Sequence, residues 1–331
     1  MSAPLSIFNF KIPKAAILFL VLAAGFESAL FWGGRVPDYA LKKKIVEASA
    51  IQAEVLFIGD SSLTADLDLK FFEQDTGLSA YAYGSAQSLG ILSYYLLLRH
   101  YLRYHPAPRY LVITVVPQTW SMTIGQSYNH LFDYYFHGDP ELFQALQEGL
   151  TPALFFRCFI LSRLPSILNR AYLNDFGFAG RRKLYEEEYE HSKKVRADLI
   201  AQKGARLIED GQYQMHCIKP ADAHGAAPSA PSAESRYYLG KLLRLAEQRK
   251  MRVFYVASPI AGECYSEAQI EGAKAMNRLV LQENPALMAI QPEVLAYPQE
   301  SFANTAFHLN KTHARRFTRM ITEKFKQVLL S

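Results

Sequence analysis

The chain has 331 residues, half of them hydrophobic, and a formal net charge of +5. A chain of this length forms one large domain or one domain with an insertion, and its apolar content excludes global disorder. The charge is mild and mixed in sign along the chain, and no stripe of aromatic and basic residues stands out. We therefore expect no nucleic-acid partner.

The three cysteines, Cys158, Cys217 and Cys264, lie far apart in the sequence. They form no CxxC pair, and no group of cysteines and histidines has the spacing of a zinc site, so we expect no metal site and no cofactor. One disulfide would fit an oxidising compartment and would leave one thiol over, but the count alone does not fix the compartment.

An apolar segment near the N-terminus directs the chain to a membrane. Two lysines precede the run from Ala15 to Trp32, which is interrupted only near its end. A helix needs about 20 apolar residues to span the hydrocarbon core, so we expect residues 1–34 to form an uncleaved anchor. The alternative is a signal peptide, because residues 21–23 resemble a small-residue cleavage site.

Short apolar runs alternate with helical patterns from residue 54 onward. Buried parallel strands are continuous apolar runs of four to eight residues, and glycine and proline mark the turns between elements. The elements predicted for this part are strand Glu54–Ile58, a helix through Phe71 and Phe72 ending near Gly77, strand Ala80–Tyr83, helix Leu89–Tyr104 and strand Tyr110–Val116.

The alternation breaks after the third strand. Residues 120–213 have a mostly helical pattern without a clear strand, and residues 219–234 are rich in Ala, Pro and Ser, which is typical of a flexible linker. The alternation then resumes. The elements predicted for this last part are helix Tyr238–Lys250, strand Val253–Val256, helix Glu267–Gln282, a short strand near Met288–Ile290 and helix Lys311–Leu330.

Strands that alternate with helices predict a parallel sheet covered by helices on both faces. We expect a flavodoxin-like α/β domain over residues 50–331, with a helical insertion and linker at residues 120–235. Ligand and active sites of such sheets lie at the carboxyl ends of the strands. The candidate functional residues are therefore those that follow the predicted strands.

Polar residues and glycines follow the first three predicted strands. Asp60 and Ser61 come directly after the first strand, and a helix starting there would direct its amides at an oxyanion beside the Ser61 hydroxyl. Gly84 follows the second strand, where a missing side chain lets the backbone approach a substrate. Gln118 follows the third strand and offers an amide donor. Each of them, taken alone, also fits an ordinary turn or helix cap.

His308 lies in a segment of small residues just before the last predicted helix. A histidine placed there can accept a proton from a serine and return it to a leaving group. A single histidine is more often structural, and the surrounding string distinguishes this one. Its members are Phe302, Asn304, His308, Leu309, Asn310, Ala314, Phe317 and Thr318.

These residues resemble the SGNH (GDSL) hydrolase superfamily. Within it, they are most similar to the membrane-anchored SGNH-like proteins of polysaccharide and cell-wall O-acylation, such as the alginate acetylation and D-alanyl transfer proteins. Gly59–Ser61 matches the family's opening Gly-Asp-Ser, Gly84 matches its glycine after the second strand, and the string around His308 matches its closing motif. The resemblance covers roughly residues 50–120 and 235–331.

The resemblance implies a serine acyl-ester enzyme. Ser61 would take the acyl group as a covalent ester, and His308 would act as the general base. The amides of Ser61 and Gly84, together with Gln118, would hold the oxyanion, and Asp60 would belong to the same substrate-binding turn.

The resemblance also implies a location and partners. The catalytic domain would lie in the periplasm or outside the cell, anchored by the N-terminus. A polysaccharide or other glycan would accept the acyl group, and a multispanning membrane acyltransferase would supply it. The apolar segment Leu154–Tyr172, which carries three arginines, would contact membrane lipid or that partner, or else form a buried helix of the insertion.

The chain departs from the family at two positions. The family's catalytic acid falls at Asn304, and an amide orients an imidazole without stabilising imidazolium by charge. Either another carboxylate, such as Glu300, substitutes for the acid, or the site runs as a serine–histidine dyad. Gln118 stands in for the family's oxyanion asparagine. Two further functions stay open, an inactive scaffold subunit of a polysaccharide modification or export complex, and a secreted esterase that uses water as the acceptor.

Overall fold

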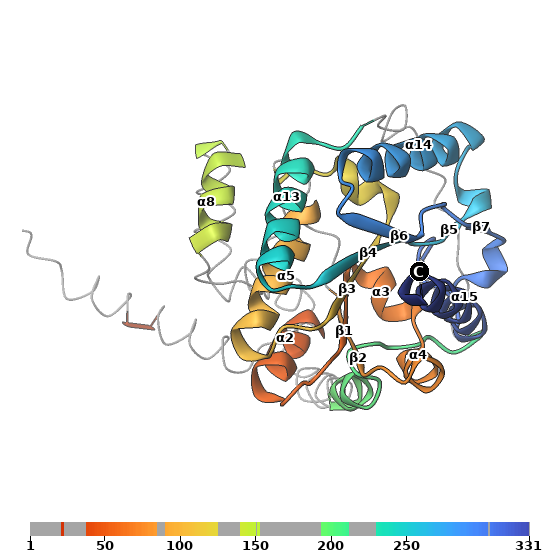
Figure 1. The fold of residues 1–331 in the computed structure, drawn as a ribbon, viewed down its shortest axis with the longest axis horizontal. Coiled ribbons are helices and arrows are strands. Elements are labelled where there is room, and N and C mark those ends of the chain that lie inside the picture. The colour runs from red at the N-terminus through yellow and green to blue at the C-terminus, as the bar shows by residue number, and fades with distance from the viewer. Residues whose placement is uncertain are drawn as a thin grey trace, which may run out of the picture.

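The structure is a computed structural model, and it describes residues 21–22, 38–84, 90–124, 140–149, 151–152, 193–211, 230–303 and 305–330. These residues form a central sheet with helices packed on both of its faces, as Figure 1 shows. The C-terminal helix lies against the sheet, so both ends of the α/β domain contribute to one core.

The central sheet has five strands, all parallel, in the order β2-β1-β3-β4-β6. The strands are β1 (Val55–Gly59), β2 (Ala80–Gly84), β3 (Tyr110–Val115), β4 (Arg252–Ala257) and β6 (Leu287–Gln291). Every residue of β1 and β2 is buried, which explains why these strands are continuous apolar runs. The strand order is that of flavodoxin-like folds, so the predicted α/β class and the parallel sheet are confirmed.

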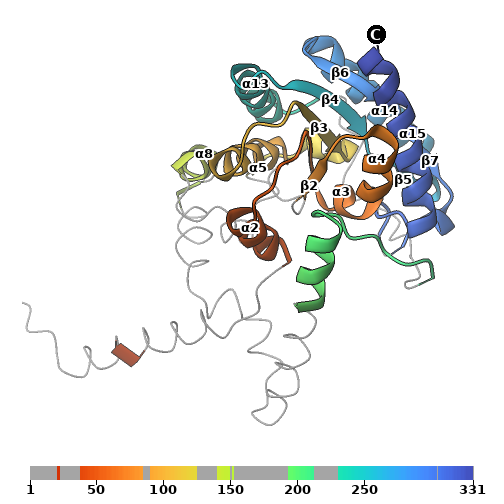
Figure 2. The same ribbon diagram turned by 60° about the horizontal axis from the view of Figure 1, so that its bottom comes forward.

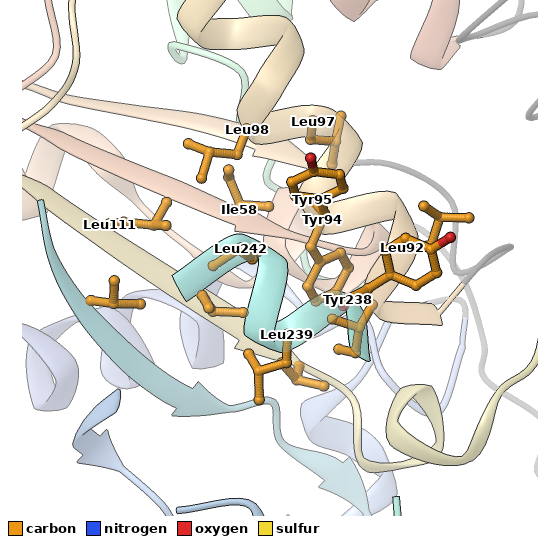
Figure 3. Packing of buried hydrophobic residues seen from close by; sticks show 14 of the residues in the cluster. Ile58, Leu92, Tyr94, Tyr95, Leu97, Leu98, Leu111, Tyr238, Leu239 and Leu242 are labelled. Carbon is orange, nitrogen blue, oxygen red and sulfur yellow. The ribbon is translucent and has the colours of Figure 1, made fainter. Parts of the chain in front are cut away.

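Three helices cover one face of the sheet: α5 (Gly90–Tyr104), α13 (Ala233–Gln248) and α14 (Glu267–Glu283). Successive strand residues point to opposite faces, and Leu56 and Ile58 of β1 point to this one. Figure 3 shows Leu242 of α13 and Leu97 of α5 among the aliphatic and aromatic side chains that surround Ile58. This layer is mainly apolar.

The opposite face is covered by α3 (Ser61–Asp66), α4 (Leu69–Thr76) and α15 (Lys311–Leu330), which Figure 2 shows on the far side of the sheet from α5 and α13. Val55 and Phe57 of β1 point into this layer. The rings of Phe57 and Phe72 meet edge to face at 5.1 Å, and Phe72 in turn meets Phe325 of α15 at 5.5 Å. These ring contacts link strand β1 to helix α15 through α4.

Smaller elements surround this core. They are α2 (Asp38–Ala48), α8 (Pro140–Gly149), a helical stretch at residues 193–201, the two-stranded parallel sheet of β5 (Ile260–Ala261) and β7 (Ala296–Tyr297), and the 3-10 turns η1 (Pro117–Ser121), η4 (Gly262–Cys264) and η5 (Gln299–Ser301). Helix α2 packs against α5. Cys264 is disulfide-bonded, and the other two cysteines lie outside the described residues.

The linker prediction is wrong at its C-terminal end. Residues 219–234 were expected to be irregular, but α13 already begins at Ala233. The Ser232 side chain accepts a hydrogen bond from the Ser235 amide, and Glu234 lies in the first turn of the helix. A serine cap followed by an acidic residue is a helix-start signal that outweighs the linker-like composition here.

Much of what the sequence predicts about membranes lies outside the described residues. This holds for most of the insertion at 120–235, for the whole of Leu154–Tyr172, and for all of the expected anchor except Val21 and Leu22, which are helical and exposed. Of the helices in the described ranges, none combines the length and the apolar character needed to cross a bilayer.

Candidate active site

The first strand ends in a tight turn that sets the position of Ser61. Gly59 closes β1, and a Cβ there would lie 2.7 Å from the Thr114 carbonyl oxygen, so no side chain fits. Asp60 is extended, and its carboxylate accepts a hydrogen bond from the Ser62 amide at 2.9 Å, which caps α3. Helix α3 therefore begins at Ser61, whose side chain is exposed at the carboxyl edge of the sheet.

Asp60 itself faces inward. It is 1 % exposed, and its carboxylate accepts hydrogen bonds from the Ser62 hydroxyl at 2.7 Å, the Tyr94 hydroxyl at 3.1 Å and the Val116 amide at 3.4 Å. The Ser62 hydroxyl also lies 2.9 Å from that of Ser258, which follows β4. Burial raises the pKa of Asp60, and these hydrogen bonds oppose the rise. The structure thus gives this side chain the role of joining three strand ends, instead of the substrate contact that the sequence suggested.

His308 lies in a braced loop between η5 and α15. Its carbonyl accepts a hydrogen bond from the Ala303 amide at 2.7 Å. The next residue, Leu309, donates its amide hydrogen to Asp66 Oδ1 at 2.8 Å and forms an antiparallel bridge with Phe302. Because Asp66 is the last residue of α3, this bond ties the histidine loop to the helix that starts at the candidate serine.

The structure brings the two candidate catalytic side chains together. His308 Nε2 lies 3.0 Å from Ser61 Oγ, although 247 positions separate the two residues in the chain. The expected proximity is confirmed, while the catalytic roles stay predictions. At this distance a neutral imidazole can accept the proton of the hydroxyl and turn it into a nucleophile.

The surroundings of His308 favour its neutral form. Burial, together with the positive charge of Lys42, lowers the pKa of His308 to about 4. In the described part of the chain, no carboxylate raises that pKa. Glu300 is exposed, and its negative charge raises the pKa of His313. Asn304, at the family's acid position, lies outside the described residues.

The two predicted oxyanion residues differ in their placement. Gly84 ends β2 beside the serine turn, where a Cβ would lie 2.7 Å from the Asp60 carbonyl oxygen and 2.9 Å from Thr64 Oγ1. Only glycine allows the backbone to approach the turn this closely. Gln118, in η1, is half-buried beside Tyr265, and its Oε1 atom has no hydrogen-bond partner among the described residues. The structure therefore brings Gly84 to the serine turn, and it places Gln118 against Tyr265.

Two charged residues near the site, Lys42 and Asp66, were not predicted from the sequence. Lys42 of α2 is 7 % exposed, and Asp66 is fully buried with a pKa that burial raises well above its usual value. Asp66 Oδ2 has no hydrogen-bond partner in the described residues. Lys42 begins a run of three lysines, which is typical of a solvated helix face. Asp66 belongs to no motif in the sequence, so neither residue shows a local sequence signal of a buried position near the site.

The arrangement supports nucleophilic chemistry at a hydroxyl. An exposed serine lies against a neutral histidine at the carboxyl edge of a parallel sheet, with the end of β2 packed beside it. No group of acidic, histidine and cysteine side chains in the described ranges could hold a metal ion. No protein-family model matches the chain, and no curated protein matches it. The fold and the site define an α/β protein with a serine–histidine pair, and its family assignment stays a proposal.

Proposed function

We propose that the protein is a serine acyl-ester enzyme of the SGNH type, which carries an acyl group on Ser61 and transfers it to a hydroxyl of a glycan. The observation that carries this proposal is the 3.0 Å contact between Ser61 Oγ and His308 Nε2. A serine that hydrogen-bonds a histidine at the edge of a sheet is the minimal unit of nucleophilic acyl transfer.

The reaction would proceed in two halves. Ser61 Oγ attacks the acyl carbonyl carbon while its proton passes to His308 Nε2, and the carbonyl oxygen takes up the negative charge. The amides of Ser61 and Gly84 stabilise that oxyanion. Collapse breaks the bond to the leaving group, which takes the proton from His308. A sugar hydroxyl then attacks the carbonyl carbon of the ester on Ser61 and gives its proton to His308. Cleavage of the bond between the acyl carbon and Ser61 Oγ releases the acylated sugar, and Ser61 Oγ takes the proton back from His308.

The acceptor, the partner and the location rest on other support. The sequence resemblance favours a glycan acceptor and a multispanning membrane acyltransferase as the acyl source. The apolar N-terminal run favours an anchor, and the disulfide at Cys264 favours an oxidising compartment. Together they support an enzyme that is held at the membrane and acts on its extracytoplasmic side.

A second candidate function is a scaffold subunit that keeps the fold without the chemistry. It is favoured by Asn304, which stands at the family's acid position. In a serine protease, replacing the acid by an amide lowers the rate by about 10⁴. A dyad that works without an acid and a site that has lost its activity are therefore the two cases to separate.

Labelling with a fluorophosphonate separates them, because this reagent reacts only with an activated serine. The full-length chain in detergent is treated with the reagent, and the modified peptide is identified by mass spectrometry. We expect modification at Ser61 that Ser61→Ala abolishes. The matched control is Ser266→Ala, which changes an exposed serine at the start of α14 and should leave labelling intact.

A folded wild-type protein that is not labelled contradicts the enzymatic proposal and supports the scaffold. Where labelling occurs, incubation with p-nitrophenyl acetate and an added polysaccharide identifies the acceptor. Acetylated polysaccharide supports acyl transfer, whereas acetate released in the same amount with and without the polysaccharide supports a secreted esterase.

A further inference from the structure

A lysine from the N-terminal helix of the domain reaches the serine site. Lys42 belongs to α2 and is nearly fully buried. Its Nζ donates a hydrogen bond to Thr64 Oγ1 at 2.6 Å and another to the Gly84 carbonyl oxygen at 3.2 Å. Burying an ammonium group costs several kcal/mol unless it is well bonded, so a hydrophobic side chain would serve packing better.

Both hydrogen-bond partners of Lys42 adjoin the proposed oxyanion site. Thr64 follows Ser61 by three positions on α3, so their side chains lie on the same face of that helix. Gly84 packs against the Asp60 carbonyl, immediately before Ser61. The ammonium group of Lys42 therefore lies beside the turn at which the acyl oxygen would become negative.

The positive charge of Lys42 also acts on His308. The positive charge of Lys42 is, after burial, the remaining cause of the lowered pKa of His308. Lys42 thus hydrogen-bonds the backbone of Gly84 directly, and it acts on His308 through its electric field.

We propose that Lys42 is a positioning residue of the Ser61 site, which locks the end of β2 at Gly84 to helix α3 and places a fixed positive charge beside the forming oxyanion. The inference rests on the proposed function. It also makes the segment that follows the N-terminal apolar run part of the site, since α2 delivers this charge.

The test uses three changes at one position and a matched control. Lys42→Met removes the charge and the donors, Lys42→Gln keeps donors without the charge, and Lys42→Arg keeps both. Lys44→Met makes the same change at an exposed lysine of the same helix. The fluorophosphonate labelling rate at neutral pH should fall about 10- to 100-fold in Lys42→Met, and Lys42→Arg should restore most of it.

A second readout does not depend on activity. NMR titration of the His308 ring should give a midpoint near the low value of about 4 in the wild type and a higher midpoint in Lys42→Met and Lys42→Gln. Lys42→Arg and Lys44→Met should leave the midpoint unchanged. A structural role alone would lower the unfolding temperature without moving this titration.

The outcomes separate this inference from the proposed function. If the wild type is not labelled at Ser61, the proposed function fails, and the His308 titration still decides whether the charge of Lys42 acts on the site. If the wild type is labelled but the His308 midpoint or the labelling rate is the same in Lys42→Met, the inference about Lys42 is overturned. Should Lys42→Met fail to fold, Lys42→Gln is judged by the same two criteria.

Discussion

The two helical layers of the protein differ in what they bury. The layer of α5, α13 and α14 fills its face of the sheet mainly with aliphatic and aromatic side chains, such as the fully buried Leu242. The layer of α3, α4 and α15 buries acidic side chains as well. Asp66 accepts the Leu309 amide of the histidine loop, and Asp68 binds Arg315 of α15 at 2.9 Å. The first layer holds the sheet, and the second holds the parts of the site relative to one another.

Burying carboxylates costs free energy that an apolar side chain would not cost. The buried Asp66 and the nearly buried Asp68 indicate that the layer of α3, α4 and α15 was shaped for position as well as for stability. This comparison leads to two expectations. Changes in the layer of α5, α13 and α14 should alter stability alone, and changes in the layer of α3, α4 and α15 should alter the reactivity of Ser61.

The largest effect is expected for His308→Ala. Removing a general base lowers rates by about 10²–10⁴-fold, so the labelling rate of Ser61 should fall by that factor while the protein stays folded. The matched control is His313→Ala, which removes a nearby histidine of α15 that bonds Asn310 and not Ser61. If His308→Ala were labelled at the wild-type rate, His308 would not be the general base for Ser61.

The apolar layer should respond in the opposite way. Leu242→Ala leaves a cavity between α13 and the sheet, and the free energy of unfolding should fall by about 2–5 kcal/mol. The labelling rate of the folded protein should stay unchanged. Denaturant unfolding measures the first quantity, with Tyr237→Ala at an exposed position of the same helix as the control. A loss of labelling in folded Leu242→Ala would show that both layers shape the site.

Asp66 tests whether its role is its hydrogen bond or its charge. Asp66→Leu leaves the Leu309 amide unpaired, which should lower the free energy of unfolding by about 1–3 kcal/mol and slow the labelling of Ser61. Asp66→Asn keeps an acceptor oxygen and removes a carboxyl that burial already disfavours as an anion. It should unfold at the wild-type temperature or above it. Equal losses in both variants would mean that the charge is needed.

The smallest effect concerns pH. Because the pKa of His308 is lowered to about 4, the labelling rate should stay constant from about pH 8 to 5 and fall with a midpoint near pH 4. The folded pKa lies below the unfolded value, so the unfolded chain binds more protons between these values, and His308 costs stability as the pH falls through that window. Circular dichroism at each pH separates loss of reactivity from unfolding. A midpoint near 6.5 would mean that His308 is not buried.

The sheet could be predicted because it follows from regular features, whereas the pairing of Ser61 with His308 was predicted from the resemblance of the string around His308 to a known family. Strands buried on both faces are continuous apolar runs, and parallel strands bring their carboxyl ends to one edge. Gly59 and Gly84 mark the ends of two such strands at positions where no side chain fits. Topology brings Ser61 and Gly84 to one edge of the sheet, and the resemblance adds His308, which follows a 3-10 turn instead of a strand.

The burial of Lys42 and Asp66 beside the site could not be predicted, because it depends on tertiary contacts. Lys42 is buried by Thr64 and Gly84, and the neighbouring lysine at position 44 is exposed. Nothing in a run of three lysines says which one turns inward. That Asp66 accepts the Leu309 amide follows from tertiary packing, which a local sequence pattern does not show.

The central claim is that Ser61 and His308 act as one catalytic unit, and a double-mutant cycle tests it most directly. The hydrolysis rate of p-nitrophenyl acetate is measured for the wild type, Ser61→Ala, His308→Ala and the double variant. Residues that act as a unit lose almost everything with the first change. The account predicts that the double variant is no slower than Ser61→Ala. Losses that multiply, so that the double variant is slower than either single variant by the full product, would contradict it.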